Sequence, residues 1–233
     1  MKSNDGLAAT LLLPAEVSFT YDGAEINCIC KTDYPFKGEI KYIITTDKPI
    51  EFDFAIRIPS FASSAIVNGN NVNVGEFYHI KKQWTDTEEV NIALDFVAEL
   101  VKRPSGMYFL ERGPLLYALP IKAKKVMHEY EKDGVKRSFP YSDYELFPES
   151  KWNYGFTSNT ISITDNDVSE VPFSSANPPL YINVEVAEVD WSISNGVCTE
   201  KPSSLNMRSQ PQIKRFIPYG CTELRMTELP ILF

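Results

Sequence analysis

The chain has 233 residues, of which 43% are hydrophobic, and a formal net charge of −8. A chain this apolar folds rather than staying disordered, and its length suits one large domain or two of roughly 100 to 130 residues. Its acidic balance, without a basic stripe, argues against nucleic acid and anionic membranes as partners. No apolar run reaches the roughly 20 residues of a membrane span.

Short strands separated by turns are expected over the first hundred residues. Alternation of apolar and polar residues is clearest in segments 51–58 and 89–96, and period 2 predicts half-buried strands there. Between them, Val67-Asn68-Gly69 is a strong hairpin signal, because a type I′ turn needs positive φ at both central residues. One helical turn is conceivable at 97–102, before Pro104. The pattern indicates an antiparallel sandwich.

The segment 102–106 is the best candidate linker, because it brings proline, serine and glycine together. We therefore expect two domains, residues 1–104 and 105–233. Just beyond the linker, the motif Arg112-Gly113-Pro114-Leu115-Leu116-Tyr117-Ala118 predicts a strand entered through a kink. Its expected work is architectural: Gly113 and Pro114 set the kink next to Arg112, and Tyr117 supplies core.

The second half also indicates a sandwich. Its charged segment 122–137 is expected to be a solvated hairpin or loop. A strand at 180–186 has its apolar residues in one phase, and the slip of that phase by Val189 and Trp191 predicts a bulge near Ala187. The predicted fold class is all-β, with two consecutive antiparallel, jelly-roll-like β-sandwich domains.

Residues suited to catalysis or metal binding are scattered. Cys28 and Cys30 share a strand face and are expected to be buried core residues, and neither histidine lies in a recognisable motif. The run 165–167 could hold calcium, although such residues more often only form a turn. Four carboxylates are candidates for acid–base work: Asp33, Asp53, Asp143 and Glu145.

Carbohydrate binding is the strongest functional idea from the residues alone. Sugar rings stack on aromatic side chains, while amides and carboxylates bind the hydroxyls. An aromatic segment interrupted by proline and glycine carries the candidate residues Tyr141, Tyr144, Trp152, Asn153 and Tyr154. The alternative is that this segment folds back and buries its rings beneath a sheet.

Several motifs together resemble one known family. Residues 32–38, 57–61, 67–69, 112–118, 152–155 and 217–222 occur in the order seen in the C-terminal half of the β-L-arabinofuranosidase family, glycoside hydrolase family 127 and its relatives. The resemblance extends over nearly the whole chain. It implies an (α/α)6 helical barrel followed by two β-sandwich domains, of which this chain is similar to the sandwiches.

The family's catalytic machinery resembles a zinc-held cysteine nucleophile located in the barrel. The resemblance therefore implies no catalytic residue, no metal site and no cofactor in this chain, and a packing role for Cys221. The expected function is that of a non-catalytic accessory region of a glycoside hydrolase, whose partner is the catalytic barrel. A homodimer is a further expectation, and the resemblance favours the bacterial cytoplasm or periplasm.

Two other functions stay open. A carbohydrate-binding module would use the aromatic segment from Tyr141 to Tyr154 as a stacking surface. A structural or subunit-interaction domain would instead present an exposed apolar patch larger than monomers usually carry.

Overall fold

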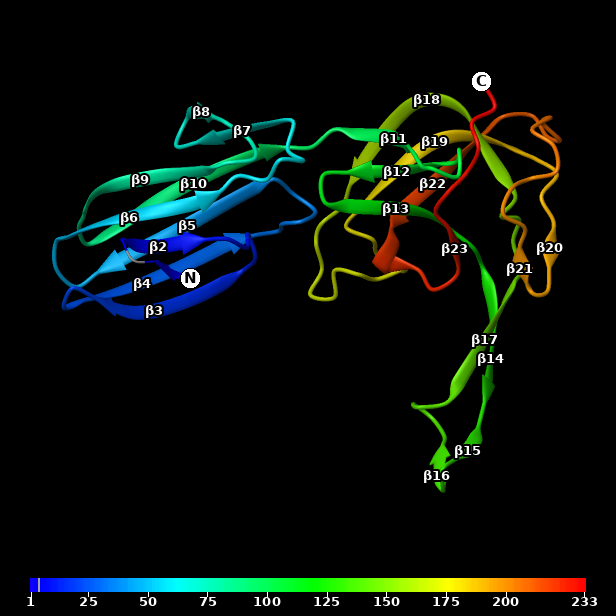
Figure 1. The fold of residues 1–233 in the computed structure, drawn as a ribbon, viewed down its shortest axis with the longest axis horizontal. Helices are drawn as coiled ribbons and strands as arrows, with labels where there is room; N and C mark the ends of the chain where they lie inside the picture. Colours follow the sequence, from blue (N-terminus) through cyan, green and yellow to red (C-terminus); the bar gives the residue numbers. More distant parts are fainter. Residues whose placement is uncertain (4) are drawn as a thin grey trace. The chain divides into compact units, whose positions relative to one another are not determined.

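A computed structural model describes residues 1–3 and 5–233 and divides the chain into two compact units (Figure 1). Met1–Ala98 and Arg112–Leu115 form the first unit; Glu99–Glu111 and Leu116–Phe233 form the second. Within the described residues, regular structure is β apart from one 3-10 turn, η1 (Tyr219–Cys221). The predicted all-β class is confirmed. No helix among the described residues is long and apolar enough to cross a membrane.

Two sheets make up the first unit. Its strands are β1 (Lys2–Ser3), β2 (Gly6–Ala9), β3 (Ala15–Tyr21), β4 (Ala24–Thr32), β5 (Glu39–Thr46), β6 (Ile50–Arg57), β7 (Ser64–Val67), β8 (Asn70–Val72), β9 (Phe77–Trp84) and β10 (Thr87–Asp95). One sheet has the order β1-β2-β6-β9 and the other β3-β4-β5-β10-β7-β8. Their pairs are antiparallel, except that β2 runs parallel to β6.

Alternating side chains of these sheets form the core of the first unit. In β6, Phe52, Phe54 and Ile56 are buried, and in β10 Val90 and Ile92 are buried while the residue between them is exposed. The period-2 prediction is confirmed in β10 and in most of β6, where Ala55, expected on the solvent face, is buried as well. It holds because each sheet turns one face to the other, as in a sandwich.

The hairpin signal at Val67-Asn68-Gly69 is also confirmed. Asn68 and Gly69 have φ values of 49° and 82°, as a type I′ turn requires. The Asn68 side chain adds to the turn, because its Oδ1 accepts the backbone N–H of Asn91 at 2.8 Å. This contact ties the β7–β8 hairpin to the neighbouring β10.

A larger sheet organises the second unit. The remaining strands are β11 (Ala98–Lys102), β12 (Tyr108–Arg112), β13 (Leu115–Pro120), β14 (Ala123–His128), β15 (Tyr130–Lys132), β16 (Val135–Arg137), β17 (Asp143–Pro148), β18 (Tyr154–Asp165), β19 (Leu180–Glu188), β20 (Ile193–Ser194), β21 (Val197–Cys198), β22 (Gln212–Pro218) and β23 (Arg225–Met226). The main sheet has the order β11-β12-β13-β22-β19-β18, and β23 pairs with β13.

The helical turn considered at 97–102 is wrong, because most of that segment is strand β11. Gly106, with φ of 86°, and the bond from Arg103 N–H to Met107 O turn the chain back, so that β11 and β12 become neighbours in the sheet. Pairing with β12 in the sheet therefore decides the conformation of this segment, against its local tendency to form a helical turn.

The bulge expected near Ala187 is also wrong. Strand β19 keeps its register through this point, and the register shift lies on the opposite strand, between Phe156 and Ile161. Val186 and Ala187 are both buried, although neighbouring residues of a strand point to opposite faces of the sheet. The C-terminal residues bond to β18 beside this point, where the Phe156 N–H donates to Pro230 O and the Leu232 N–H donates to Phe156 O.

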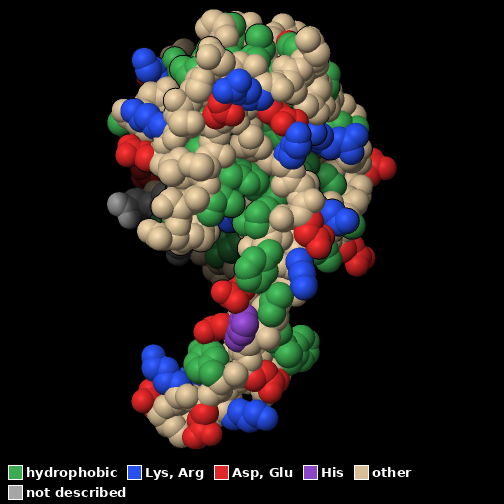
Figure 2. Space-filling view, turned by 90° about the vertical axis from the view of Figure 1, so that its right-hand side faces the viewer, with side chains coloured by type: hydrophobic (Ala, Val, Ile, Leu, Met, Phe, Trp, Pro, Cys, Tyr) green, Lys and Arg blue, Asp and Glu red, His purple; other side chains and the backbone are tan. Residues whose placement is uncertain are grey.

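A narrow two-stranded ribbon projects from the second unit (Figures 1 and 2). Strands β14 and β17 pair without a register shift, and β15 and β16 continue the ribbon to an exposed turn at Asp133-Gly134. The solvated hairpin predicted for 122–137 is confirmed. We call this ribbon, residues 123–148, the arm.

Candidate functional site

An open groove of about 780 Å³ lies at the base of the arm. Its lining comes from four segments of the second unit, residues 120–125, 146–150, 173–175 and 220–224. The arm supplies one wall through Lys125 and Leu146, which pair across β14 and β17 and so share a face. The turn η1 and the residues after it supply the opposite side.

An ion pair crosses this groove. Lys125 Nζ lies 2.7 Å from Glu223 Oε1, and the two side chains remain 43% and 66% exposed. The same ammonium lies 4.6 Å from the centroid of the Tyr144 ring. The groove therefore presents a donor and an acceptor whose charges cancel, next to an aromatic ring.

Hydroxyl and apolar groups surround the ion pair. Ser150 Oγ accepts the Lys122 N–H at 2.9 Å, and Thr222 Oγ1 donates to Leu224 O at 3.0 Å. Phe173 is 47% exposed and packs against Gly220, where an added Cβ would lie 2.6 Å from the ring. Polar groups thus lie beside apolar walls, the combination typical of ligand pockets.

Tyr141, Tyr144 and Trp152, three of the predicted sugar-binding residues, do not form one surface. Tyr141 is 77% exposed in the arm, whereas Tyr144 is half-buried beneath Lys125. Trp152 lines a second hollow of about 240 Å³. That hollow shares the side chains Ile121, Leu146 and Leu224 with the groove, so the two hollows adjoin.

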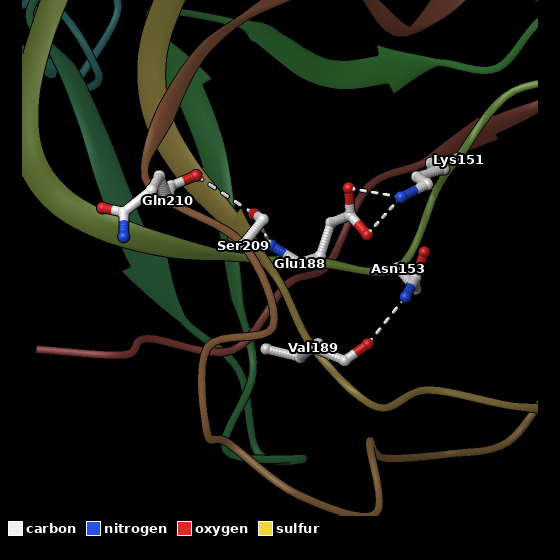
Figure 3. A network of polar contacts seen from close by, with 6 residues as sticks. All are labelled: Lys151, Asn153, Glu188, Val189, Ser209 and Gln210. Carbon is white, nitrogen blue, oxygen red and sulfur yellow. Dashed lines mark hydrogen bonds and ion pairs between the residues drawn. The ribbon is translucent and has the colours of Figure 1, made fainter.

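Asn153 and Tyr154 are instead held in the framework of the second unit. Figure 3 shows the Asn153 amide donating to Val189 O, at 2.6 Å, beside the ion pair that Lys151 makes with Glu188. Tyr154 begins β18 and is 3% exposed. These contacts fold the segment back onto the sheet, which is the alternative considered for it above.

The central motif forms a tight turn rather than a kinked strand. Gly113 and Pro114 join β12 to β13, and Gly113 has φ of 56°. A Cβ there would lie 2.8 Å from the Phe96 ring, which the Arg112 guanidinium also contacts at 5.6 Å from the ring centroid. Tyr117, fully buried, follows in β13. The motif is an element of packing.

Two of the candidate carboxylates pair with histidines. His79 Nδ1 lies 2.6 Å from Asp53 Oδ2 in the first unit, and His128 Nε2 lies 2.6 Å from Glu145 Oε2 on the arm. Both histidine side chains are at least half exposed. Neither pair lies in the groove, so these contacts serve as surface ion pairs when the histidine is protonated.

The other two carboxylates, Asp33 and Asp143, have local partners. Asp33 lies 3.5 Å from Lys37 Nζ, and Asp143 accepts the Tyr130 hydroxyl at 3.4 Å. In the run 165–167, the Asn166 amide donates to Pro178 O, as a turn residue does. Across residues 1–3 and 5–233, no three His, Cys, Asp or Glu side chains are grouped closely enough to hold a metal ion.

Three of the four thiols are shielded from solvent. Burial, with a smaller contribution from Cys30, raises the pKa of Cys28 to about 12. Burial also raises the pKa of Cys30 and of Cys221. Cys198 is exposed in β21.

These environments predict the thiol chemistry. At about pH 8, a thiol reagent should modify Cys198 and leave the other cysteines intact, because only thiolate reacts and buried thiols stay protonated. Mass spectrometry after brief alkylation should find one labelled site in folded protein and four after denaturation. Labelling of Cys28 at the rate of Cys198 would contradict the described burial.

Comparisons with known proteins support the resemblance. Residues 6–96 match the family model described as the beta-L-arabinofuranosidase GH127 middle domain, which confirms the predicted similarity to part of that family. No curated protein matches the sequence.

Solved structures have a similar fold. A GH127 beta-L-arabinofuranosidase from Geobacillus stearothermophilus T6 is 18% identical, with a TM-score of 0.65, over 99% of this chain and 34% of that chain. A GH127 beta-arabinofuranosidase is 18% identical, with a TM-score of 0.61, over 96% of this chain and 34% of that chain. A glycoside hydrolase is 14% identical, with a TM-score of 0.57, over 97% of this chain and 36% of that chain. The chain spans about a third of the length of these relatives.

Proposed function

We propose that this chain, which matches the GH127 middle domain over residues 6–96, is a non-catalytic accessory region of a glycoside hydrolase. That match is the observation that carries the proposal. The proposal is supported by the similar fold of two GH127 enzymes, in which nearly the whole of this chain matches about a third of the enzyme's length. On this proposal, the hydrolysis of arabinofuranosides is carried out by a separate catalytic domain.

An apolar hollow on the first unit supports attachment to such a domain. It has a volume of about 240 Å³ and lies where β2, β3 and β4 come together. Leu11, Leu13 and Val17 at this hollow are 73%, 46% and 43% exposed. Exposed side chains of this kind are stabilised when a partner covers them. The partner proposed here is the helical catalytic barrel that the family resemblance implies.

The arrangement of ionisable groups is consistent with a supporting role. The paired carboxylates Asp53 and Glu145 belong to different units, and each contacts a surface histidine. Cys28 and Cys30, which are two positions apart in the sequence, are buried, and burial raises the pKa of both thiols. A catalytic thiol needs a lowered pKa, which is the opposite shift.

The test is an assay of the purified chain with an aryl β-L-arabinofuranoside. We expect no hydrolysis above a buffer control, while circular dichroism confirms the folded β structure. A full-length GH127 enzyme assayed in parallel serves as the positive control. Turnover that survives repurification and disappears in Asp53→Asn or Cys28→Ser would overturn the non-catalytic assignment.

A further inference from the structure

We propose that the groove at the base of the arm binds a neutral oligosaccharide. This site is separate from the apolar hollow through which the chain would attach to a catalytic domain, and the accessory role does not require it. Its volume of about 780 Å³ lies within the range of roughly 300 to 1,000 Å³ usual for ligand pockets.

The polar groups of the groove favour a neutral polyhydroxylated ligand. The Lys125 ammonium has three donors and the Glu223 carboxylate offers several acceptor sites, and only part of this capacity is used at their 2.7 Å contact. Sugar hydroxyls donate and accept at once, so they can bridge such a pair. Because these two charges cancel, the pair itself gives an anion no net attraction, and Lys122, which also lines the groove, has its own carboxylate partner in Glu149 at 4.0 Å.

The apolar walls suit the C–H faces of sugar rings. Phe173, 47% exposed, lies on one side of the groove, and Leu146 from the arm lies among the other lining residues. Stacking of aliphatic ring faces on such side chains supplies the affinity that hydroxyl contacts in water do not. A small inorganic ion would leave these walls unused.

The adjoining hollow explains why the ligand is an oligosaccharide. Ile121, Leu146 and Leu224 line both the groove and the hollow that Trp152 lines. A ligand of several rings can lie in the groove and place one ring near the Trp152 indole. A single ring fills only one of the two hollows, so it buries less apolar surface.

Calorimetry on the full chain tests this proposal, with arabinotriose and xylotriose as neutral probes, L-arabinose as a single ring and trigalacturonate as an acidic probe. We expect a neutral trisaccharide to bind about tenfold more tightly than the monosaccharide. Glu223→Gln and Lys125→Met should each weaken this binding about five- to tenfold, because each leaves one bonding group of the pair unmatched. Amide NMR shifts should move at Ser175, Thr222 and Glu223.

The matched control is Glu89→Gln. Glu89 pairs with Lys41 at 2.9 Å on the first unit and is comparably exposed, so its substitution should leave binding unchanged. No heat with any neutral probe at about 10 mM, equal weakening by Glu89→Gln, or shifts confined to the arm around Tyr141 would each overturn the proposal. Binding of trigalacturonate alone would identify an anion site instead. These assays measure binding, so their failure leaves the accessory role unaffected.

Discussion

Replacing Gly38 with alanine is expected to destabilise the first unit by at least about 3 kcal/mol. The reason is a backbone contact. Gly38 O accepts the Leu94 N–H at 2.9 Å, and a Cβ on Gly38 would lie 1.9 Å from Leu94 O. Because the obstacle is a carbonyl of β10 rather than a movable side chain, the strand itself would have to shift and break its ladder.

Denaturant titration of Gly38→Ala, compared with Gly69→Ala, measures this effect. Gly69 also lies in the first unit and has φ of 82°, but a Cβ added there would meet nothing within 4 Å. Its substitution should cost only about 1–2 kcal/mol of backbone strain. Equal losses in the two variants would show that β10 yields to the new methyl group.

Truncating Trp84 to alanine is expected to cost about 3–5 kcal/mol of the free energy of unfolding. Its ring is 1% exposed and stacks on Phe52 with centroids 5.2 Å apart. It meets Phe54 edge-on at 6.3 Å, and its Nε1–H donates to Phe52 O at 3.1 Å. The substitution removes both ring contacts and leaves that carbonyl without its indole donor.

Two further variants separate these contributions in thermal and denaturant unfolding. Trp84→Phe keeps a ring but loses the hydrogen bond, so we expect a loss of about 1–3 kcal/mol. Trp152→Ala, in the second unit, removes the same side chain from a half-buried site and should cost less than Trp84→Ala. A loss for Trp152→Ala that matches Trp84→Ala would contradict the burial described for the two residues.

Local patterns predicted the first unit well. Alternation located β6 and β10, and Val67-Asn68-Gly69 located the β7–β8 hairpin, because both signals depend only on neighbours in the chain. The same reasoning misjudged β19. Val186 and Ala187 are both buried, and the register shift lies on the facing strand β18, which the alternation along β19 alone does not reveal.

The groove could not be predicted for a similar reason. Lys125, Phe173 and Glu223 come from separate parts of the chain and share no motif. The aromatic segment drew attention because its rings are close in sequence, yet Tyr154 faces the core and Tyr141 faces solvent. Closeness in sequence did not give a shared surface, because the segment contains both an arm strand and the start of a core strand.

The closing segment of the second unit has a consequence for how this unit folds. Leu229 bridges to Tyr108, and Arg103 donates to Glu228, which lies 125 positions later in the chain. Contacts of such sequence separation form late and slow folding. During synthesis, the second unit therefore cannot form these contacts until residues 228–232 have left the ribosome, whereas the first unit has most of its partners available much earlier. Production at reduced temperature and with chaperones should accordingly benefit the second unit more than the first.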